Sequence, residues 1–512
     1  MKKNLIYLLA FLFIIIINDT IMAQATHYCS MTSADLAEVK RQMMENREEL
    51  ANHVFTRNDV TYVPVRFYLV ALSNGTGRAT ERAGMQAICN LNENYSDQDV
   101  QFYLKEFKYL NNNTIYNNPG SFSGSTNIKA NMIYNAINIF VVGTDLGGGS
   151  GGGIVQAYYQ PPAGTNSGAN DWIVCNQSFL TDQYVLTHEM GHFLSLPHPF
   201  DGWDNTPWDP AVHGNPVLFS TAPEGGQVEK VNGSNCMTAG DGICDTPADY
   251  NFGITYSTGC NYTGDARDSN NELLVPLKEN VMNYFTCSDQ TFTDGQKIEV
   301  QNSLNSNNRN YCTPNYTPNT DNIVGPIALI YPNNLETAPN YNFVNLQWEA
   351  KDGATHYAVE YNKIGGPLVS QIVESNSLLL TDLDQSSTYF WKVHPFNESF
   401  GCAQTSASQI FKTGDMFLAT NEVAEIDSWL VAPNPVSSGQ SIRVLMEAGE
   451  SFDADVTLVD LTGKVVKILP NQRFNAGNST MAIETDDLAA GIYTLAVRSK
   501  NGISNKRIAI MK

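Results

Sequence analysis

The stretch HEMGHFLSLPH, residues 188–198, constrains the fold most, because it holds three of the eight histidines in this 512-residue chain. On an α-helix, residues four positions apart lie nearly one above the other, so His188 and His192 face the same side. His198 lies too far along the chain to meet them on a continuous helix. Pro197 disfavours helical backbone at the residue before it and limits continuation beyond it. The pattern therefore predicts a short helix followed by a turn that brings His198 back.

Three imidazoles arranged in this way can hold one metal ion and leave one coordination position for water. An all-imidazole set favours zinc, which lowers the pKa of such a water to near 7. Glu189 lies one position round from His188, where it is suited to take a proton rather than to bind the metal. Because HExxH also occurs by chance, a pair of core histidines is the alternative. The third histidine favours the metal site.

The first residues indicate export. A short basic start, an apolar run from Leu5 to Ile17 and small residues at Ala23 and Ala25 are typical of a signal peptide, here residues 1–25. The apolar run is shorter than the roughly 20 residues that span a bilayer, so we expect cleavage rather than a membrane anchor. The mature chain is thus expected to be secreted, with no transmembrane segment.

The cysteines agree with an oxidising compartment, where most of the nine should pair. Four of them lie close together in the sequence and could form two disulfides: Cys236, Cys244, Cys260 and Cys287. Three connectivities are open for these four, and the odd total leaves one thiol over.

The net charge of −22, from 52 acidic and 30 basic residues, argues against nucleic acid and anionic membranes as partners. It is typical of a soluble exported protein, and some carboxylates are candidates for calcium.

The chain divides by composition into a region of mixed helices and strands, residues 56–315, a linker at 316–326, and two regions of short strands at 327–414 and 428–512. We expect helices at 33–50 (with Ser33 as the cap), 81–95 and 184–194, and strands at 60–72, 100–107, 136–146 and 171–177. A glycine run at 147–153 is interpreted as a loop rather than a phosphate site. The predicted fold class is multidomain: an α+β (α/β-like) catalytic domain followed by two small all-β sandwiches.

The C-terminal half carries two resemblances. The order of Trp348, the strand with Tyr357 and Tyr361, the Leu-rich turn at 378–383 and TYFWKV resembles a fibronectin type III module. WLVAPNPVSSG, DVTLVDLTGKVV, GIYTLAV and NKRIAIMK resemble the C-terminal sorting domain of the type IX secretion system of Bacteroidetes. The second resemblance implies that the type IX secretion machinery is a partner.

The histidine motif resembles that of the metzincin clan, HExxHxxGxxH followed by a Met-turn. Ser195 stands where the clan has glycine, so either the serine is strained or the turn differs. ENVMNYF supplies Met282 as the Met-turn residue and Tyr284 as the tyrosine that stabilises an oxyanion in some metzincins. The alternatives are an ordinary core methionine and a packed aromatic ring.

Within the clan the chain resembles the pappalysin family, through HEMGHFLSLPHPFDGW, GDGICDTPAD and ENVMNYFTC, over most of residues 60–312. This resemblance implies an endopeptidase with Glu189 as general base and then acid, and calcium near the active site. Asp241 and Asp245 are the candidates for calcium, although clustered Asp in a glycine-bearing loop also suits a simple turn. Cys244 and Cys287 would tether this loop and the Met-turn if bonded within the group of four.

Family members often begin with a propeptide, which here would be residues 26–55. A free cysteine in such a segment, Cys29, could bind zinc as a fourth ligand and displace the water, leaving eight cysteines to pair. A disulfide to Cys89 or a spare thiol are the alternatives.

These features together predict a secreted, monomeric zinc endopeptidase that hydrolyses protein or peptide substrates. The rival interpretation is a catalytically silent surface adhesion or binding protein with a protease-like shell. The intact Glu189 favours the enzyme, because a pure binding protein has no need of it.

Overall fold

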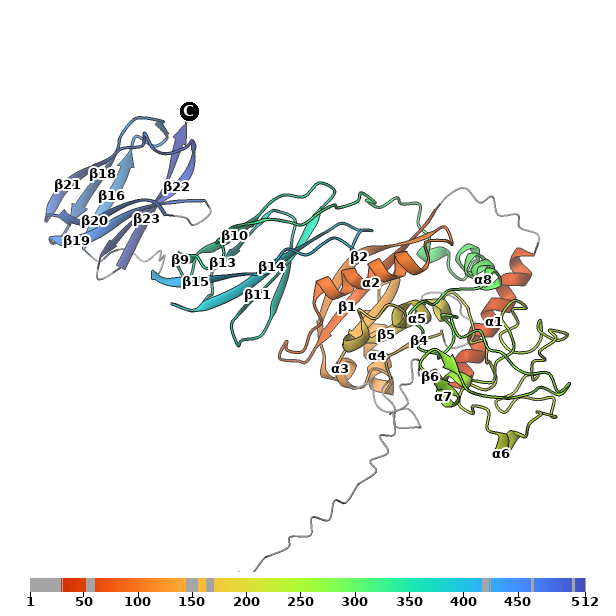
Figure 1. The fold of residues 1–512 in the computed structure, drawn as a ribbon. Helices are drawn as coiled ribbons and strands as arrows, with labels where there is room; N and C mark the ends of the chain where they lie inside the picture. The colour runs from red at the N-terminus through yellow and green to blue at the C-terminus, as the bar shows by residue number, and fades with distance from the viewer. Residues whose placement is uncertain are drawn as a thin grey trace, which may run out of the picture.

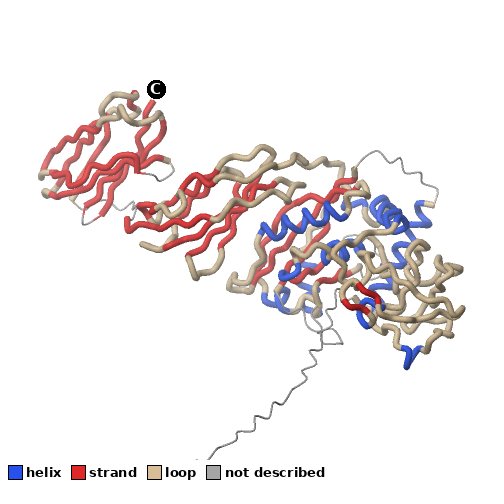
Figure 2. Tube along the Cα trace, in the orientation of Figure 1, coloured by secondary structure: helices blue, strands red, loops and turns tan. Residues whose placement is uncertain are grey.

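The computed structural model describes residues 29, 31–51, 60–143, 155–162, 170–416, 423, 425–461, 465–499 and 502–511. The predicted signal peptide and the glycine run at 147–153 lie outside these residues. Within the described residues, helices are confined to the N-terminal part, and two β-sandwiches follow it (Figures 1 and 2). The predicted fold class is confirmed. Among the residues described, no helix is both long and apolar enough to cross a bilayer.

The N-terminal part is built on a five-stranded sheet of order β2-β1-β3-β5-β4. Its strands are β1 (Thr61–Ala71), β2 (Val100–Asn111), β3 (Ile137–Val142), β4 (Ala157–Gln160) and β5 (Trp172–Asn176). All pairs are parallel except β4 with β5, which places an antiparallel strand at one edge. β1 is buried along nearly its whole length, as expected for a parallel strand covered on both faces.

Helices cover both faces of this sheet. Successive residues of β1, such as Phe67 and Tyr68, point to opposite faces of the sheet and enter separate cores. One core includes residues of α1 (Ser33–Leu50), α2 (Glu81–Asn94) and α5 (Val185–Phe193), and the other those of α3 (Asn113–Asn117) and α4 (Phe122–Asn131). The motif helix thus belongs to the larger core.

The N-cap of α1 lies one residue earlier than expected. Thr32, not Ser33, is the N-cap: its side chain accepts from the backbone of Asp35, whose carboxylate accepts from Thr32 in turn. This capping box satisfies two backbone donors at once, which a cap at Ser33 would not do in this geometry.

Between α5 and α8 (Asp294–Asn305) the chain forms a long irregular region. It contains only short elements: α6 (Pro210–His213), α7 (Phe252–Thr255), β6 (Ser257–Thr258) and β7 (Asn261–Tyr262). Disulfides Cys236–Cys244 and Cys260–Cys287 close loops within it, which selects one of the three open connectivities. Short 3₁₀ turns at η1 (Gln177–Phe179) and η2 (Asn310–Cys312) flank the region.

The first sandwich packs a three-stranded sheet, β13-β10-β8, against a five-stranded sheet, β12-β11-β14-β15-β9. Its strands are β8 (Leu329–Tyr331), β9 (Thr337–Asn340), β10 (Val344–Trp348), β11 (His356–Lys363), β12 (Val369–Val373), β13 (Ser377–Leu380), β14 (Thr388–Phe396) and β15 (Gln409–Met416). Trp348 and Trp391 are fully buried between the sheets, with ring centroids 6.5 Å apart.

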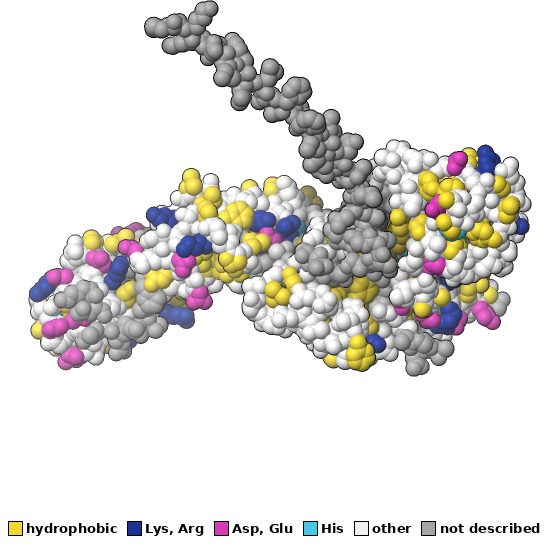
Figure 3. All heavy atoms as spheres, turned by 90° about the horizontal axis from the view of Figure 1, so that it is seen from below, with side chains coloured by type: hydrophobic (Ala, Val, Ile, Leu, Met, Phe, Trp, Pro, Cys, Tyr) yellow, Lys and Arg dark blue, Asp and Glu magenta, His cyan; other side chains and the backbone are white. Residues whose placement is uncertain are grey.

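The second sandwich pairs β16-β18-β21 with β17-β23-β22-β19-β20. Its strands are β16 (Ile426–Ala432), β17 (Val436–Ser437), β18 (Ile442–Ala448), β19 (Phe452–Asp460), β20 (Val465–Phe474), β21 (Gly477–Ile483), β22 (Gly491–Ser499) and β23 (Gly502–Met511). On the face drawn in Figure 3, basic side chains are scattered among acidic ones along the molecule rather than gathered in a stripe.

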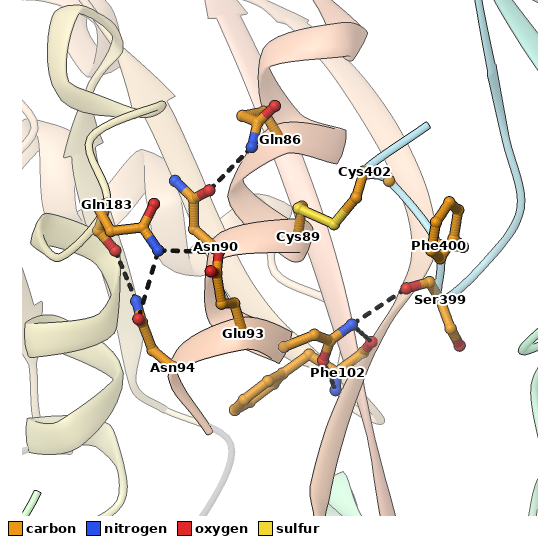
Figure 4. Close-up of a disulfide and its surroundings, with 12 residues drawn as sticks. Gln86, Cys89, Asn90, Glu93, Asn94, Phe102, Gln183, Ser399, Phe400 and Cys402 are labelled. Atoms are coloured by element: carbon orange, nitrogen blue, oxygen red, sulfur yellow. Dashed lines mark hydrogen bonds between the residues drawn. A yellow bond between two sulfur atoms is a disulfide. The ribbon is translucent and has the colours of Figure 1, made fainter. Parts of the chain in front are cut away.

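A third disulfide joins the N-terminal part to the first sandwich. Cys89 of α2 bonds to Cys402, in the loop after β14 (Figure 4). The suggested disulfide between Cys29 and Cys89 is therefore wrong. So is the expectation that eight cysteines pair, because Cys175 and Cys312 are buried free thiols, as is Cys29. Cys175 and Cys312 can stay unpaired because a buried free cysteine packs as a small hydrophobic side chain.

Candidate metal centre

The helix that carries the motif ends in the left-handed turn that a glycine normally makes. The Ser195 amide donates to His192 and the Leu196 amide to Gly191, both at 2.9 Å, which is the Schellman arrangement. Ser195 has φ +69°, so the chain keeps the left-handed geometry at a cost on the order of 1 kcal/mol. Its hydroxyl is in hydrogen-bond contact with Asn46 at 3.3 Å and lies 3.2 Å from the Ser303 hydroxyl.

The turn brings the three imidazoles together. Nε2 of His198 lies 3.1 Å from Nε2 of His188 and 3.0 Å from Nε2 of His192. Nitrogen ligands at about 2.0–2.1 Å from a tetrahedral zinc would lie about 3.3 Å apart. The spacing therefore fits a single ion.

The other ring nitrogens fix the tautomer. Nδ1 of His188 lies 2.8 Å from the Val281 carbonyl, and Nδ1 of His192 lies 2.8 Å from the Leu196 carbonyl. Nδ1 of His198 lies 2.5 Å from Asp204 Oδ1. Because acceptors hold each Nδ1–H, the three Nε2 lone pairs point at one another, which is favourable only around a cation.

Burial keeps these rings neutral, which is the form that binds a metal. It lowers the pKa of His188 and of His198 to about 3, and that of His192 well below its ordinary value. Neighbouring rings add to the effect at His188 and His192.

Glu189 and Cys29 face the same point. The thiol of Cys29 lies 3.6 Å from Oε2 of Glu189, and its sulfur and the ligand nitrogens of the three histidines all lie within 4.8 Å of one another. Burial raises the pKa of Glu189 to about 8, and burial with the neighbouring Glu189 raises the pKa of the Cys29 thiol well above its ordinary value. Cys29 forms a β-bridge with Ala157 on edge strand β4, which places its thiol at the site.

Of the two downstream residues of the predicted Met-turn, one lies against the motif helix and the other against its histidines. Met282 is fully buried, and a Cβ on Gly191 of α5 would lie only 2.3 Å from its sulfur. The Tyr284 ring stands edge-on to His198, with centroids 4.9 Å apart. The structure thus brings together every residue that the motifs singled out for the metal and the reaction.

The two calcium candidates have different surroundings. Asp245 accepts from the Thr293 hydroxyl at 2.8 Å and from the Gly295 amide at 2.7 Å, and so holds the first turn of α8. Asp241 is fully buried with Oδ2 unpartnered among the described residues, and Oε2 of buried Glu229 is likewise unpartnered. Burial and the charge of Asp241 raise the pKa of Glu229 to about 9.

Sequence reasoning missed two partners of the site. Asp204 orients His198. Its position six residues after that histidine, just past a glycine, could have marked it as a candidate partner. Glu229 approaches Asp241 only through the fold of the irregular region, and no sequence pattern marks it.

The comparisons with known proteins agree with this site. An extracellular metalloprotease of Neurospora crassa is 26% identical over 300 residues, which cover 55% of this chain and 86% of the relative. An extracellular metalloprotease of Sordaria macrospora is 26% identical over 260 residues, covering 48% of this chain and 74% of the relative. The chain is thus a distant homologue of extracellular metalloproteases, and its histidine cluster is suited to a metal. The metzincin and pappalysin assignments stay predictions.

The C-terminal prediction is confirmed. The family described as "Secretion system C-terminal sorting domain" matches residues 430–511. This match and the extracellular relatives indicate an exported protein, secreted or at the cell surface, as the sequence predicts.

Two solved structures of fibronectin type III domains are also similar. The FN1–FN3 domains of chicken CNTN1 share 14% identity at a TM-score of 0.18, covering 37% of this chain and 66% of that one. The fn3 domain of the human collagen alpha-1(XX) chain shares 21% identity at a TM-score of 0.15, covering 20% and 95%. The sandwich itself is defined by its own strand pairing.

Proposed function

We propose that this protein is a secreted zinc endopeptidase of the metzincin type, similar to pappalysins and made as a latent precursor. The observation that supports this most directly is the meeting of three neutral imidazole nitrogens, at 3.0–3.1 Å, beside the carboxylate of Glu189. Because every Nδ1–H group is engaged by an acceptor, the three Nε2 lone pairs converge, and this arrangement is favourable only when a cation lies between them.

The residues divide the work of hydrolysis. Zinc, when bound, would polarise the scissile carbonyl and lower the pKa of a nearby water. Glu189 takes the proton from the attacking water and returns it to the leaving amine. Tyr284, beside His198, donates a hydrogen bond to the carbonyl oxygen as negative charge develops on it. Met282 forms the apolar floor that supports α5.

Latency follows from Cys29. Its sulfur lies where a fourth ligand would approach the histidines, and it contacts Glu189. α1 anchors the segment through Lys40 to Asp201 at 2.6 Å and Arg47 to Glu299 at 2.6 Å. Removal of residues 26–55 would expose the histidines, and the mature enzyme would comprise residues 56–315, the linker 316–326 and the sandwich 327–414, with the sorting domain 428–512 removed on export.

Calcium is proposed at Glu229 and Asp241. Two buried carboxylates with unpartnered oxygens are costly unless protonated or bound to a cation. Added Ca²⁺ should raise the melting temperature of the unaltered protein and not that of Asp241→Asn. An equal response of both proteins would remove calcium from this position.

The function is tested with Glu189→Gln in the active, secreted protein. Hydrolysis of casein should fall by about 10²–10⁴-fold or more, with zinc content unchanged, because only the proton acceptor is lost. Glu81→Gln, at a glutamate equally buried in α2, is the matched control and should keep its activity. Retained hydrolysis in metal-loaded Glu189→Gln would refute the role of Glu189. Absence of chelator-sensitive hydrolysis in the unaltered protein would favour the silent binding protein.

A further inference from the structure

Arg309 completes the C-terminal end of α5. The last carbonyls of a helix need partners from outside it. Those of Gly191 and His192 are satisfied by the turn at Ser195. The carbonyl of Phe193 instead accepts from Nε and Nη2 of Arg309, at 3.0 and 2.6 Å. A buried cation at this position also suits the helix dipole.

The same guanidinium reaches the edge of the sheet. Nη1 donates to Asp171 Oδ2 at 2.6 Å, and Nη2 donates to the Tyr159 hydroxyl at 3.0 Å. Tyr159 lies in β4, and Asp171 directly precedes β5. The guanidinium carbon also lies 4.1 Å from the centre of the Phe193 ring. One side chain, itself 99% buried, therefore bonds the metal-binding helix and the edge strand together.

The spacing between α5 and β4 matters for the reaction. Cys29 pairs with Ala157 of β4 and contacts Glu189 of α5, so a residue paired with this edge lies directly at the carboxylate. A substrate strand added to the same edge would meet Glu189 in the same way. A further Arg309 contact, to Gln42 at 3.3 Å, comes from the proposed propeptide, so the bonds to Phe193, Asp171 and Tyr159 would remain after activation.

We propose that Arg309 is a positioning residue, which sets α5 against β4 and so aims the Glu189 carboxylate at the bound peptide. The proposal rests on the proposed protease function. A lysine could neutralise Asp171 but could not also hold the Phe193 carbonyl and the Tyr159 hydroxyl, because its ammonium lacks the planar fork of donors.

The test compares Arg309→Lys with Arg66→Lys in the active, secreted enzyme. Arg66 is also buried, bonding Glu106 at 2.7 Å and the Ile133 carbonyl at 2.7 Å, but it lies on β1. Arg309→Lys should lower kcat by about 10- to 100-fold with KM and zinc content unchanged, since a shift of about 1 Å can cost as much. Arg66→Lys should keep its kcat when each variant is assayed at the same interval below its own melting temperature.

Equal kcat losses in the two variants would overturn the proposal, and so would loss of zinc from Arg309→Lys. If Arg309→Lys does not fold, Arg309→Gln takes its place. Backbone hydrogen exchange gives a readout that needs no activity: exchange in α5 should accelerate in the Arg309 variant alone. An unaltered enzyme without hydrolysis would contradict the proposed function, while the exchange result would still decide whether Arg309 holds α5.

Discussion

Replacing both Cys89 and Cys402 by serine removes the covalent link between α2 and the first sandwich. The two cysteines are 313 residues apart, and the chain-entropy relation gives about 5.7 kcal/mol for a loop of this length. Because measured values often fall below the relation, we expect the free energy of unfolding to drop by about 3–6 kcal/mol. Cys236→Ser with Cys244→Ser is the control: a separation of 8 residues gives only about 2.5 kcal/mol.

The non-covalent contacts should keep the sandwich docked at 25 °C. Arg82 pairs with buried Glu360 at 2.9 Å, and the Leu104 amide of edge strand β2 donates to the Glu398 carbonyl at 2.7 Å. Asn92 donates to the Ser399 carbonyl at 3.1 Å (Figure 4 shows the surrounding loop). Hydrolysis by the double variant should therefore match that of the unaltered enzyme.

Urea unfolding, monitored by tryptophan fluorescence, measures the loss in the free energy of unfolding. Gel filtration after cleavage in the linker is a second readout. After cleavage, the sandwich should stay attached to the unaltered protein in urea below its midpoint and separate in the double variant. If the double variant loses no more stability than the control, the reasoning from loop length is refuted. Identical behaviour before and after reduction would mean that the disulfide does not form.

Three further predictions concern the site and its surroundings. Cys29→Ala should make the full-length precursor hydrolyse casein, and a variant as inert as the unaltered precursor would exclude Cys29 as the latency ligand. Asp204→Asn should weaken zinc binding about 10- to 100-fold in competition with a chelating dye, because His198 loses the carboxyl group that orients its ring; an unchanged Kd would contradict this. Burial lowers the pKa of His394 to about 4, so the unfolded chain binds more protons between pH 6.5 and 4, and up to about 3 kcal/mol of stability is lost as pH falls through this window. His394→Gln should lose less stability over that range than His356→Gln in acid unfolding, and equal losses would show that His394 is not responsible.

Local features of the sequence predicted local structure well. The helix expected at 184–194 is α5, Val185–Phe193, and the strands expected at 60–72 and 171–177 are β1 and β5 within one or two residues. These elements follow from periodicity and from Pro197, which act through backbone geometry within a few residues. The left-handed turn at Ser195 was one of two open alternatives, because a serine tolerates either outcome at small cost.

Apart from one helix cap, the errors concern contacts between distant parts of the chain. Cysteine counting could not foresee that Cys175 and Cys312 remain buried thiols, because pairing depends on which strands and helices come together. The cap at Thr32 was missed by one residue, since Ser and Thr compete for a role that the final turn of the backbone decides.

The sequence by itself determined that two imidazoles share one helix face, that a turn follows, and that a carboxylate stands beside them, because residue spacing converts directly into direction on a helix. Only the tertiary structure decided what surrounds them: Asp204 behind His198, Cys29 in front of Glu189 and Arg309 at the helix end. It also decided that Cys402 bonds to Cys89 of α2. Those contacts join segments up to hundreds of residues apart. The free energy that selects them comes from burying whole surfaces together, which short-range spacing does not encode.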